Sequence, residues 1–370
     1  MQIKSLKLLP VSLTFKQPFV SAHETLSQRN LLLVQVVDEL GNQGLGELEA
    51  FEQPYYSSET LVGAKKIIEH TLAPTLTNFC FDNPCQIQTL WQKVRGNNFA
   101  QAAVETAIWA AFAQRQQQPL RTIIAQSAGS STNSSIHTGI SLGLSDLKTT
   151  TNQVQQALNQ GYQKIKIKIN GNADLKRLAS IRQRFIHAPL MADANGSLTL
   201  TPDLASNIDQ LNLIMIEDPF GPQDLRNSHI LQKQMSTPIC FDEPITSVAA
   251  ALNALYFQQC QIISCKISAL GGITPVIQLI QAQRQYHFPL WCGAMLEGGI
   301  GRALNLAVAS LNNFNFPSDI AETKRYYQKD LTQEKFELQE GKIILPTATG
   351  LGVQLLPSYQ KQLHNLPSLI

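Results

Sequence analysis

Five ionisable residues recur at nearly constant spacing through the middle of the chain. Each ends a short apolar run, and neighbours in the series are 24 or 25 residues apart: Lys168, Asp193, Glu217, Asp242 and Lys266. Three carboxylates brought together without paired arginines repel one another, and a hard divalent cation bound through oxygen relieves that repulsion. The series therefore predicts that Asp193, Glu217 and Asp242 bind Mg²⁺, with Mn²⁺ as the other candidate.

Lysines flank the three acids, with Lys166 and Lys168 before them and Lys266 after them. A lysine beside a metal-bound substrate lies near two cations, the metal and the other lysine. Its pKa then falls from about 10.4 towards neutrality, and part of the population becomes free amine. Such a lysine can remove a proton from a substrate.

The same spacing defines the elements that must position these side chains. The apolar runs have the length of buried strands, and segments of helical length lie between them, at 174–185, 203–211 and 224–235. One strand, one helix and two short loops occupy about 25 residues, so the pattern predicts repeated βα units with a parallel sheet. A closed ring of such units gathers its strand ends at one mouth, where barrel enzymes carry their chemistry.

Each residue taken alone has a simpler structural explanation. Asp193 could be a helix N-cap, and the alternating lysines Lys164, Lys166 and Lys168 could be the solvated face of an edge strand. The mouth of a barrel gains no stability from ionisable residues at five strand ends in register. We therefore favour one joint functional site.

The residues around these positions resemble a known family. The set Lys-x-Lys, Asp, Glu, Asp, Lys on successive strands is similar to the enolase superfamily and its muconate-lactonising-enzyme subgroup. Within that subgroup the chain resembles the o-succinylbenzoate synthase / N-succinylamino acid racemase family. The resemblance covers nearly the whole chain and is carried by residues 161–169, 193–195, 216–220, 242–244, 265–274 and 293–302.

The resemblance implies an α/β fold, namely a modified TIM barrel, (β/α)7β, with an α+β capping domain. We expect the cap to comprise residues 1–125, joined by about 322–370 of the C-terminal tail, and the barrel to comprise 126–321. The first barrel strand is predicted at 135–142. A strand at 338–346 should return to the cap, and 357–370 should be a surface segment. Residues 14–27 have few helix formers and are predicted to be a long mobile loop over the mouth.

The resemblance also implies roles for single residues. Lys168 aligns with the second lysine of the family motif and is the expected base, Lys166 should hydrogen-bond the substrate carboxylate, and Lys266 should act from the other face. Lys164 is expected to face solvent as a bystander. The expected substrate-binding residues are Ser141, Asn195, Leu296 and Phe19.

Two family activities begin with the same proton abstraction. One is metal-dependent syn-dehydration to o-succinylbenzoate in menaquinone biosynthesis, and the other is racemisation of N-succinylamino acids. Racemase members commonly carry arginine where this chain has Ala269, and many members have Glu-Thr-Gly where it has Glu297-Gly-Gly, so we favour the synthase. Dipeptide epimerisation and lactonisation remain open. A catalytically silent relative that acts as a binding protein would be expected to have lost an acid or a lysine.

Composition limits the kinds of partner that the protein is expected to bind. The 29 basic and 27 acidic residues give a net charge of +2 without a basic run, so nucleic acid is not expected. Residues 298–303 lack the strand and acidic partner of a dinucleotide loop, and His137 is expected to be structural. Six cysteines without a C-x-x-C pair, no signal peptide and no long apolar run predict a cytoplasmic protein away from membranes. The expected partner is a small carboxylate, with homo-oligomerisation left open.

Overall fold

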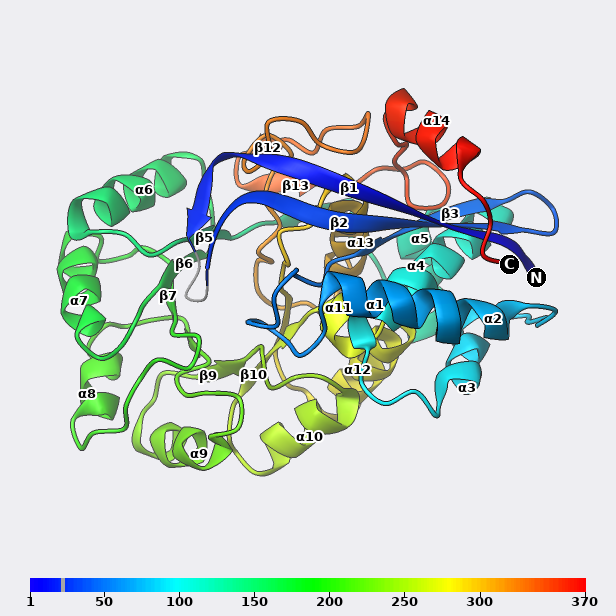
Figure 1. Cartoon of the computed structure of the whole chain (residues 1–370). Coiled ribbons are helices and arrows are strands. Elements are labelled where there is room, and N and C mark those ends of the chain that lie inside the picture. The colour runs from blue at the N-terminus through cyan, green and yellow to red at the C-terminus, as the bar shows by residue number, and fades with distance from the viewer. Residues whose placement is uncertain (21–23) are drawn as a thin grey trace.

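The computed structural model describes residues 1–20 and 24–370. Figure 1 shows a parallel sheet surrounded by helices, with a long antiparallel hairpin that reaches across it from a group of N-terminal helices. The predicted α/β fold with a cap beside a barrel is confirmed. In the described part of the chain, no helix is both long enough and apolar enough to span a bilayer.

The hairpin belongs to a three-stranded sheet formed by β1 (Ile3–Val20), β2 (Thr25–Asp38) and β3 (Gln43–Leu48). The prediction of a mobile loop at 14–27 is wrong for the described residues, because 14–20 and 25–27 continue the two strands; residues 21–23 lie outside the described residues. These residues continue the strands because of tertiary contacts. The ring centroid of Phe15 lies 4.9 Å from that of Tyr327, and Phe19 lies 5.9 Å from Tyr326. These partners are distant in sequence, so local pattern does not reveal them.

The N-terminal helices pack on this sheet. They are α1 (Leu61–Ile67), a π-helical turn (Ile68–Leu72), α2 (Ala73–Leu76), a 3₁₀ turn (Pro84–Gln86), α3 (Ile87–Trp91), α4 (Asn98–Arg115) and α5 (Leu120–Ala128). Alanines on α4 allow a close approach to β3. A Cβ atom at Gly46 would lie 2.0 Å from the Ala103 carbonyl oxygen, so only glycine permits this distance between helix and strand.

The barrel sheet has seven parallel strands in sequential order. They are β5 (Ile140–Leu142), β6 (Ile165–Lys168), β7 (Leu190–Asp193), β8 (Ile216–Glu217), β9 (Ile239–Phe241), β10 (Ile262–Cys265) and β11 (Leu290–Cys292). The segment that follows the last barrel helix closes the ring. The Asp319 N–H donates to the Cys292 carbonyl (3.1 Å), and the Gly139 N–H donates to the Ser318 carbonyl (2.7 Å). The arrangement is therefore the expected (β/α)7β barrel.

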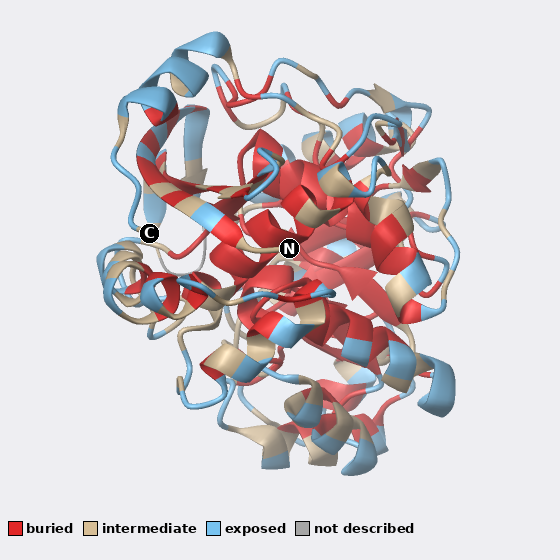
Figure 2. Ribbon diagram, turned by 90° about the vertical axis from the view of Figure 1, so that its right-hand side faces the viewer, coloured by how far each residue is buried: buried red, intermediate tan, exposed pale blue. Residues whose placement is uncertain are grey.

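Helices connect these strands on the outside of the ring. They are α6 (Leu147–Asn159), α7 (Asp174–Arg184), α8 (Leu204–Asp209), α9 (Leu225–Gln234), α10 (Val248–Tyr256), α11 (Ile267–Leu270), α12 (Ile273–Tyr286) and α13 (Gly299–Ala309). Three of these helices, α6, α9 and α10, start with a side-chain N-cap. For example, the Asp146 side chain accepts the Thr149 N–H at the start of α6, and Ser247 accepts the Ala250 N–H at the start of α10. Buried residues concentrate on the strands and inner helix faces, whereas outer faces are exposed (Figure 2).

Two predictions about strands near the ends of the barrel need correction. The stretch 135–142 forms two strands rather than one, since β4 (Ser135–His137) pairs with β13 (Lys342–Ile344) and only β5 joins the barrel sheet. The tail strand at 338–346 therefore does not return to the cap; β13 and β12 (Leu338–Gln339) form a small sheet with β4 instead. The last helix, α14 (Pro357–Asn365), packs on β1, with Leu363 buried.

Glu105 joins the N-terminal helices to the barrel. It lies on α4, and its carboxylate accepts the backbone N–H groups of Ile273 (2.6 Å) and Thr274 (2.9 Å) at the start of α12. The Trp109 indole N–H donates to the same carboxylate (3.0 Å). An acid from one part of the chain thus caps a barrel helix, a position that the helix dipole also favours.

We expect Glu105→Ala to lower the free energy of unfolding by about 3 kcal/mol, because it leaves buried N–H donors without an acceptor. Urea denaturation monitored by circular dichroism measures this. Glu105→Gln is the matched control, since its carbonyl keeps one acceptor, and it should lose less than half as much. Equal losses of unfolding free energy in the two variants would show that the hydrogen bonds from Glu105 to the start of α12 contribute nothing beyond its charge.

Candidate active site

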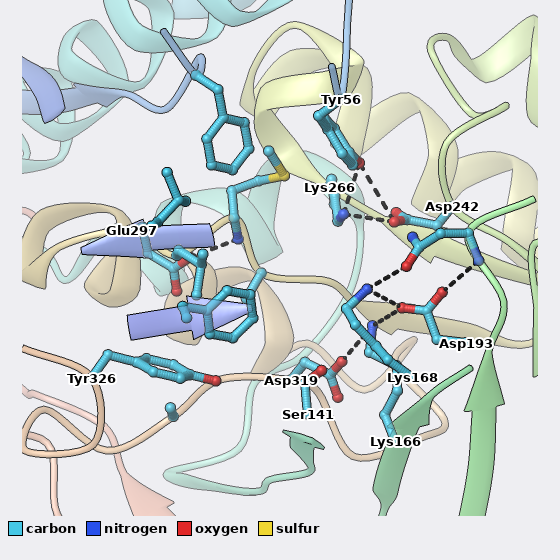
Figure 3. A pocket seen from close by; sticks show the side chains of 18 of the residues that line it. Tyr56, Ser141, Lys166, Lys168, Asp193, Asp242, Lys266, Glu297, Asp319 and Tyr326 are labelled. Carbon is cyan, nitrogen blue, oxygen red and sulfur yellow. Dashed lines mark hydrogen bonds and ion pairs between the residues drawn. The ribbon is translucent and has the colours of Figure 1, made fainter. Parts of the chain in front are cut away.

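The predicted residues meet in one pocket at the C-terminal ends of the barrel strands. The pocket is lined by two of the predicted metal ligands, the three predicted catalytic lysines and the four predicted substrate-binding residues: Asp193, Asp242, Lys166, Lys168, Lys266, Ser141, Asn195, Leu296 and Phe19. Glu217 is fully buried behind Lys166. Figure 3 shows the lysines and acids converging from several strands.

Strand register explains this convergence. Lys168 is paired with Asp193 across β6 and β7, and Asp193 with Glu217 across β7 and β8. Side chains at alternate positions of a strand share a face, so Lys166 and Lys168 both point inwards. β6 and β10 stand four places apart in the closed ring, and Lys266 directly follows β10. Lys168 and Lys266 therefore enter the pocket from opposite walls.

Each acid is paired with a lysine. The Nζ atom of Lys168 lies 2.9 Å from Asp193 Oδ2, that of Lys266 lies 2.6 Å from Asp242 Oδ2, and that of Lys166 lies 3.1 Å from Glu217 Oε2. Among the described residues, no three acidic, histidine or cysteine side chains stand grouped for metal binding. The acids converge on the same region, and each is held by a lysine ammonium group.

The donor set nevertheless fits a hard divalent cation. Burial raises the pKa of Glu217 to about 8, and the charges of Asp193 and Asp242 contribute to the rise. A bound cation would relieve the repulsion among these three acids. Asp242 Oδ1 is buried without a hydrogen-bond partner. Three carboxylates supply only oxygen, the ligand that Mg²⁺ and Mn²⁺ prefer.

The pKa values of Lys166 and Lys266 are not lowered as expected. Burial alone would lower the pKa of Lys266, but Asp242 and Tyr56 raise it well above its usual value. Burial alone would also lower the pKa of Lys166, but the charges of Asp319 and Glu217 raise that pKa well above its usual value. The expected lowering requires the acids to be bound to a metal, because the same carboxylates otherwise stabilise the ammonium forms.

The substrate-binding candidates form the rest of the wall. Asn195 accepts a hydrogen bond from Lys168 (2.5 Å) and donates to Glu243 (2.9 Å). Both Asn195 (φ +41°) and Leu296 (φ +56°) have left-handed backbones, which non-glycine residues adopt at a cost of about 1 kcal/mol or more. The Leu296 backbone is held by the Tyr327 hydroxyl, which donates to its carbonyl.

Among the polar residues of this pocket that were not predicted, two contact the catalytic lysines directly. Tyr56 lies between β3 and α1, and its hydroxyl accepts a hydrogen bond from Lys266 (2.7 Å). Asp319 closes the barrel ring, and its Oδ2 atom lies 2.8 Å from Lys166 Nζ. Asp319 ends the last strand segment and could have been found by the rule that found the other acids. Tyr56 follows no periodic pattern.

The prediction that Lys164 faces solvent is wrong. Its side chain is fully buried, and its Nζ atom lies 3.0 Å from Asp319 Oδ1. In a closed barrel, every second residue of a strand points into the ring. Lys164 therefore shares the inward face with Lys166 and Lys168, one layer deeper.

Comparison with known proteins agrees with this architecture. Residues 3–125 match the N-terminal domain model of mandelate racemase and muconate lactonizing enzyme, and residues 149–359 match the enolase C-terminal domain-like model. The chain belongs to the enolase superfamily, in its muconate-lactonising subgroup. The resemblance to the o-succinylbenzoate synthase / N-succinylamino acid racemase family is confirmed by the relatives.

Two relatives and one solved structure illustrate the family membership. An o-succinylbenzoate synthase of Enterococcus faecalis is 40% identical, with 96% of each chain covered. An N-succinylamino acid racemase of Thermus thermophilus is 32% identical, covering 96% of this chain and 95% of the relative. A crystal structure of an enolase-superfamily member from Listeria innocua superposes with a TM-score of 0.92 at 36% identity, covering 98% of this chain and 97% of that one.

We expect Mg²⁺ to raise the melting temperature, because a cation relieves the repulsion among buried acids. At 100 times the dissociation constant the gain is about 2.7 kcal/mol. Differential scanning fluorimetry with and without EDTA measures it. Asp242→Asn should abolish the shift, whereas Asp203→Asn, which changes an exposed acid before α8, should leave it intact. A shift that survives in Asp242→Asn would place the cation elsewhere.

Proposed function

We propose that this protein is an o-succinylbenzoate synthase, which dehydrates 2-succinyl-6-hydroxy-2,4-cyclohexadiene-1-carboxylate in menaquinone biosynthesis. The observation that carries the proposal is the pair Lys168 and Lys266 on opposite walls of a pocket, with the acids Asp193 and Asp242 beside them. The synthases among the relatives, at 34–40% identity, support the choice of reaction.

Asp193, Glu217 and Asp242 would hold Mg²⁺, or Mn²⁺ in its place. When bound, the cation supplies Lewis-acid stabilisation to the substrate carboxylate. Lys166 donates a hydrogen bond to that carboxylate. Negative charge grows there as the neighbouring carbon loses its proton, so donors fixed in advance lower the barrier most.

Lys168, as the free amine, takes the proton from the substrate carbon. The resulting ammonium group then protonates the departing hydroxyl on the same face, and water leaves as the ring becomes aromatic. Lys266 remains a cation on the opposite wall. The protons balance, since Lys168 ends the cycle as the free amine with which it began. Asn195, hydrogen-bonded to Lys168, fixes the position of the base.

The pocket wall suits an organic carboxylate. Phe19, Leu26 and Met295 supply apolar surface beside the charged groups. Such a site excludes water from the reacting atoms and strengthens electrostatic interactions. All six cysteines are free, which supports a reducing cytoplasmic location.

N-succinylamino acid racemisation is the second candidate. The same opposed lysines favour it, because removing a proton on one face and returning it on the other requires two bases. The racemase from Thermus thermophilus among the relatives supports it too. A catalytically silent binding protein is less consistent with a complete set of acids and lysines in one pocket.

We expect purified protein with Mg²⁺ to turn over the cyclohexadiene carboxylate at least roughly tenfold more efficiently than N-succinylamino acids, a barrier difference of about 1.4 kcal/mol. The formation of o-succinylbenzoate, followed by ultraviolet absorbance, and polarimetry of N-succinylamino acids measure the two rates in parallel. Higher kcat/KM for the amino acids would reverse the assignment. Turnover of neither would favour the silent relative.

A separate experiment tests the base. In D₂O with Mg²⁺, the protein should exchange the α-proton of an N-succinylamino acid, as followed by NMR. Lys168→Ala should reduce exchange of the proton on its own face by at least about 10³-fold. Lys176→Ala, which removes an exposed lysine on α7, is the matched control and should exchange normally. Undiminished exchange in Lys168→Ala would assign the base to another residue.

A further inference from the structure

At the wall of the pocket, two buried lysines share one carboxylate. Asp319 is buried, with Oδ1 3.0 Å from Lys164 Nζ and Oδ2 2.8 Å from Lys166 Nζ. The Lys164 ammonium group also lies 3.2 Å from the centroid of the Trp291 ring. This cation–π contact adds to the stabilisation that Lys164 receives from the carboxylate it shares with Lys166. Figure 3 shows Asp319 directed at Lys166.

The surroundings are built to hold this arrangement. The Asp319 backbone closes the barrel through its bond to Cys292, so the carboxylate cannot move far. Gly139 leaves the space that the pair occupies: a Cβ there would lie 2.8 Å from Lys164 Cε and 3.0 Å from Asp319 Oδ1. Burying an ammonium group costs several kcal/mol, so this deep lysine is not explained as scaffold.

Lys166 stands between two groups of acids. On one side is Asp319. On the other are Glu217 (3.1 Å) and Asp193 (3.6 Å), the acids expected to bind the cation. An ammonium group that remained on Glu217 and Asp193 would compete with Mg²⁺ for their oxygens. Asp319, which is outside that set, offers Lys166 an alternative partner.

We propose that Asp319 is a positioning residue that draws Lys166 away from Glu217 and Asp193, with Lys164 as its fixed counter-charge. With Lys166 held by Asp319, the carboxylate oxygens of Glu217 and Asp193 are available to the cation. The Lys166 ammonium group also stays beside the position of the substrate carboxylate. This inference rests on the proposed function for the role of Lys166 in turnover. Its effect on metal affinity can be measured without substrate.

The test is a double-mutant cycle on Mg²⁺ affinity, measured by isothermal titration calorimetry. In Asp319→Asn, Lys166 should return to Glu217 and Asp193, and the dissociation constant should rise about tenfold. Lys166→Met removes the competitor and should lower it about threefold. In the double variant the dissociation constant should equal that of Lys166→Met within about twofold, because without Lys166 there is no ammonium group for residue 319 to draw away from Glu217 and Asp193.

A merely structural or through-space role predicts a different result. Asp319→Asn would then weaken Mg²⁺ binding by the same factor with and without Lys166, and that outcome overturns the proposal. So does an unchanged dissociation constant in Asp319→Asn. Since this variant leaves Lys164 unpaired, Lys164→Met/Asp319→Asn serves as a second variant. It should show the same weakened affinity with a melting temperature closer to that of the parent.

Turnover separates this proposal from the proposed function. Asp319→Asn should lower kcat about a hundredfold while KM changes less than about threefold, since Lys166 acts mainly on charge that develops during reaction. A parent that binds Mg²⁺ but turns over no substrate overturns the proposed function alone, and the calorimetric cycle still decides the role of Asp319. A parent that binds no Mg²⁺ overturns both.

Discussion

The barrel interior depends on the pairing of buried ammonium groups with buried carboxylates. Four lysines (Lys164, Lys166, Lys168 and Lys266) face four acids (Asp193, Glu217, Asp242 and Asp319) across the strand ends. An unpaired charge at this depth costs several kcal/mol, so neither set is tolerable without the other. The fold accepts this cost only because closed strands bring both sets to the same place. A divalent cation would add positive charge to this balance, which makes the lysines and the cation alternatives for the same oxygens.

The position of the cap matters because it completes the walls of the pocket. Phe19 and Tyr56 come from the N-terminal part of the chain, and Lys266 comes from the barrel. The Arg29 guanidinium, buried on β2, donates to the Ala50 carbonyl (3.1 Å) and to the Glu49 carbonyl, which fixes the chain that leads to Tyr56. Glu105 fastens the same part to α12. The chemistry of the barrel mouth therefore depends on contacts made well away from it.

The regular part of the site was predictable from sequence. Because each βα unit has a similar length, Asp193, Glu217 and Asp242 could be assigned to strand ends and to one pocket. Lys164 shares the inward face of the strand with Lys166 and Lys168, but its buried partner Asp319 lies far away in sequence, so the local sequence does not show that an ammonium group can be held at this depth. The strand over residues 14–20 cannot be predicted from local sequence, since the partners of Phe15 and Phe19 lie more than 300 residues away. Tyr56 gave no signal, because its position depends on the packing of the cap.

The position of Ala269 bears on the choice between the two reactions. Ala269 packs in the core formed with the N-terminal helices, and its carbonyl accepts a hydrogen bond from Asn98 (2.6 Å). An arginine there would bring a second cation near Lys266 and favour its free amine. Here Ala269 adds no such charge, and the Tyr56 hydroxyl accepts a hydrogen bond from the Lys266 ammonium group, which favours the charged form. A lysine that stays charged suits a dehydration, which needs one base and one fixed cation. It suits a racemisation less well, since that reaction needs both lysines to exchange protons.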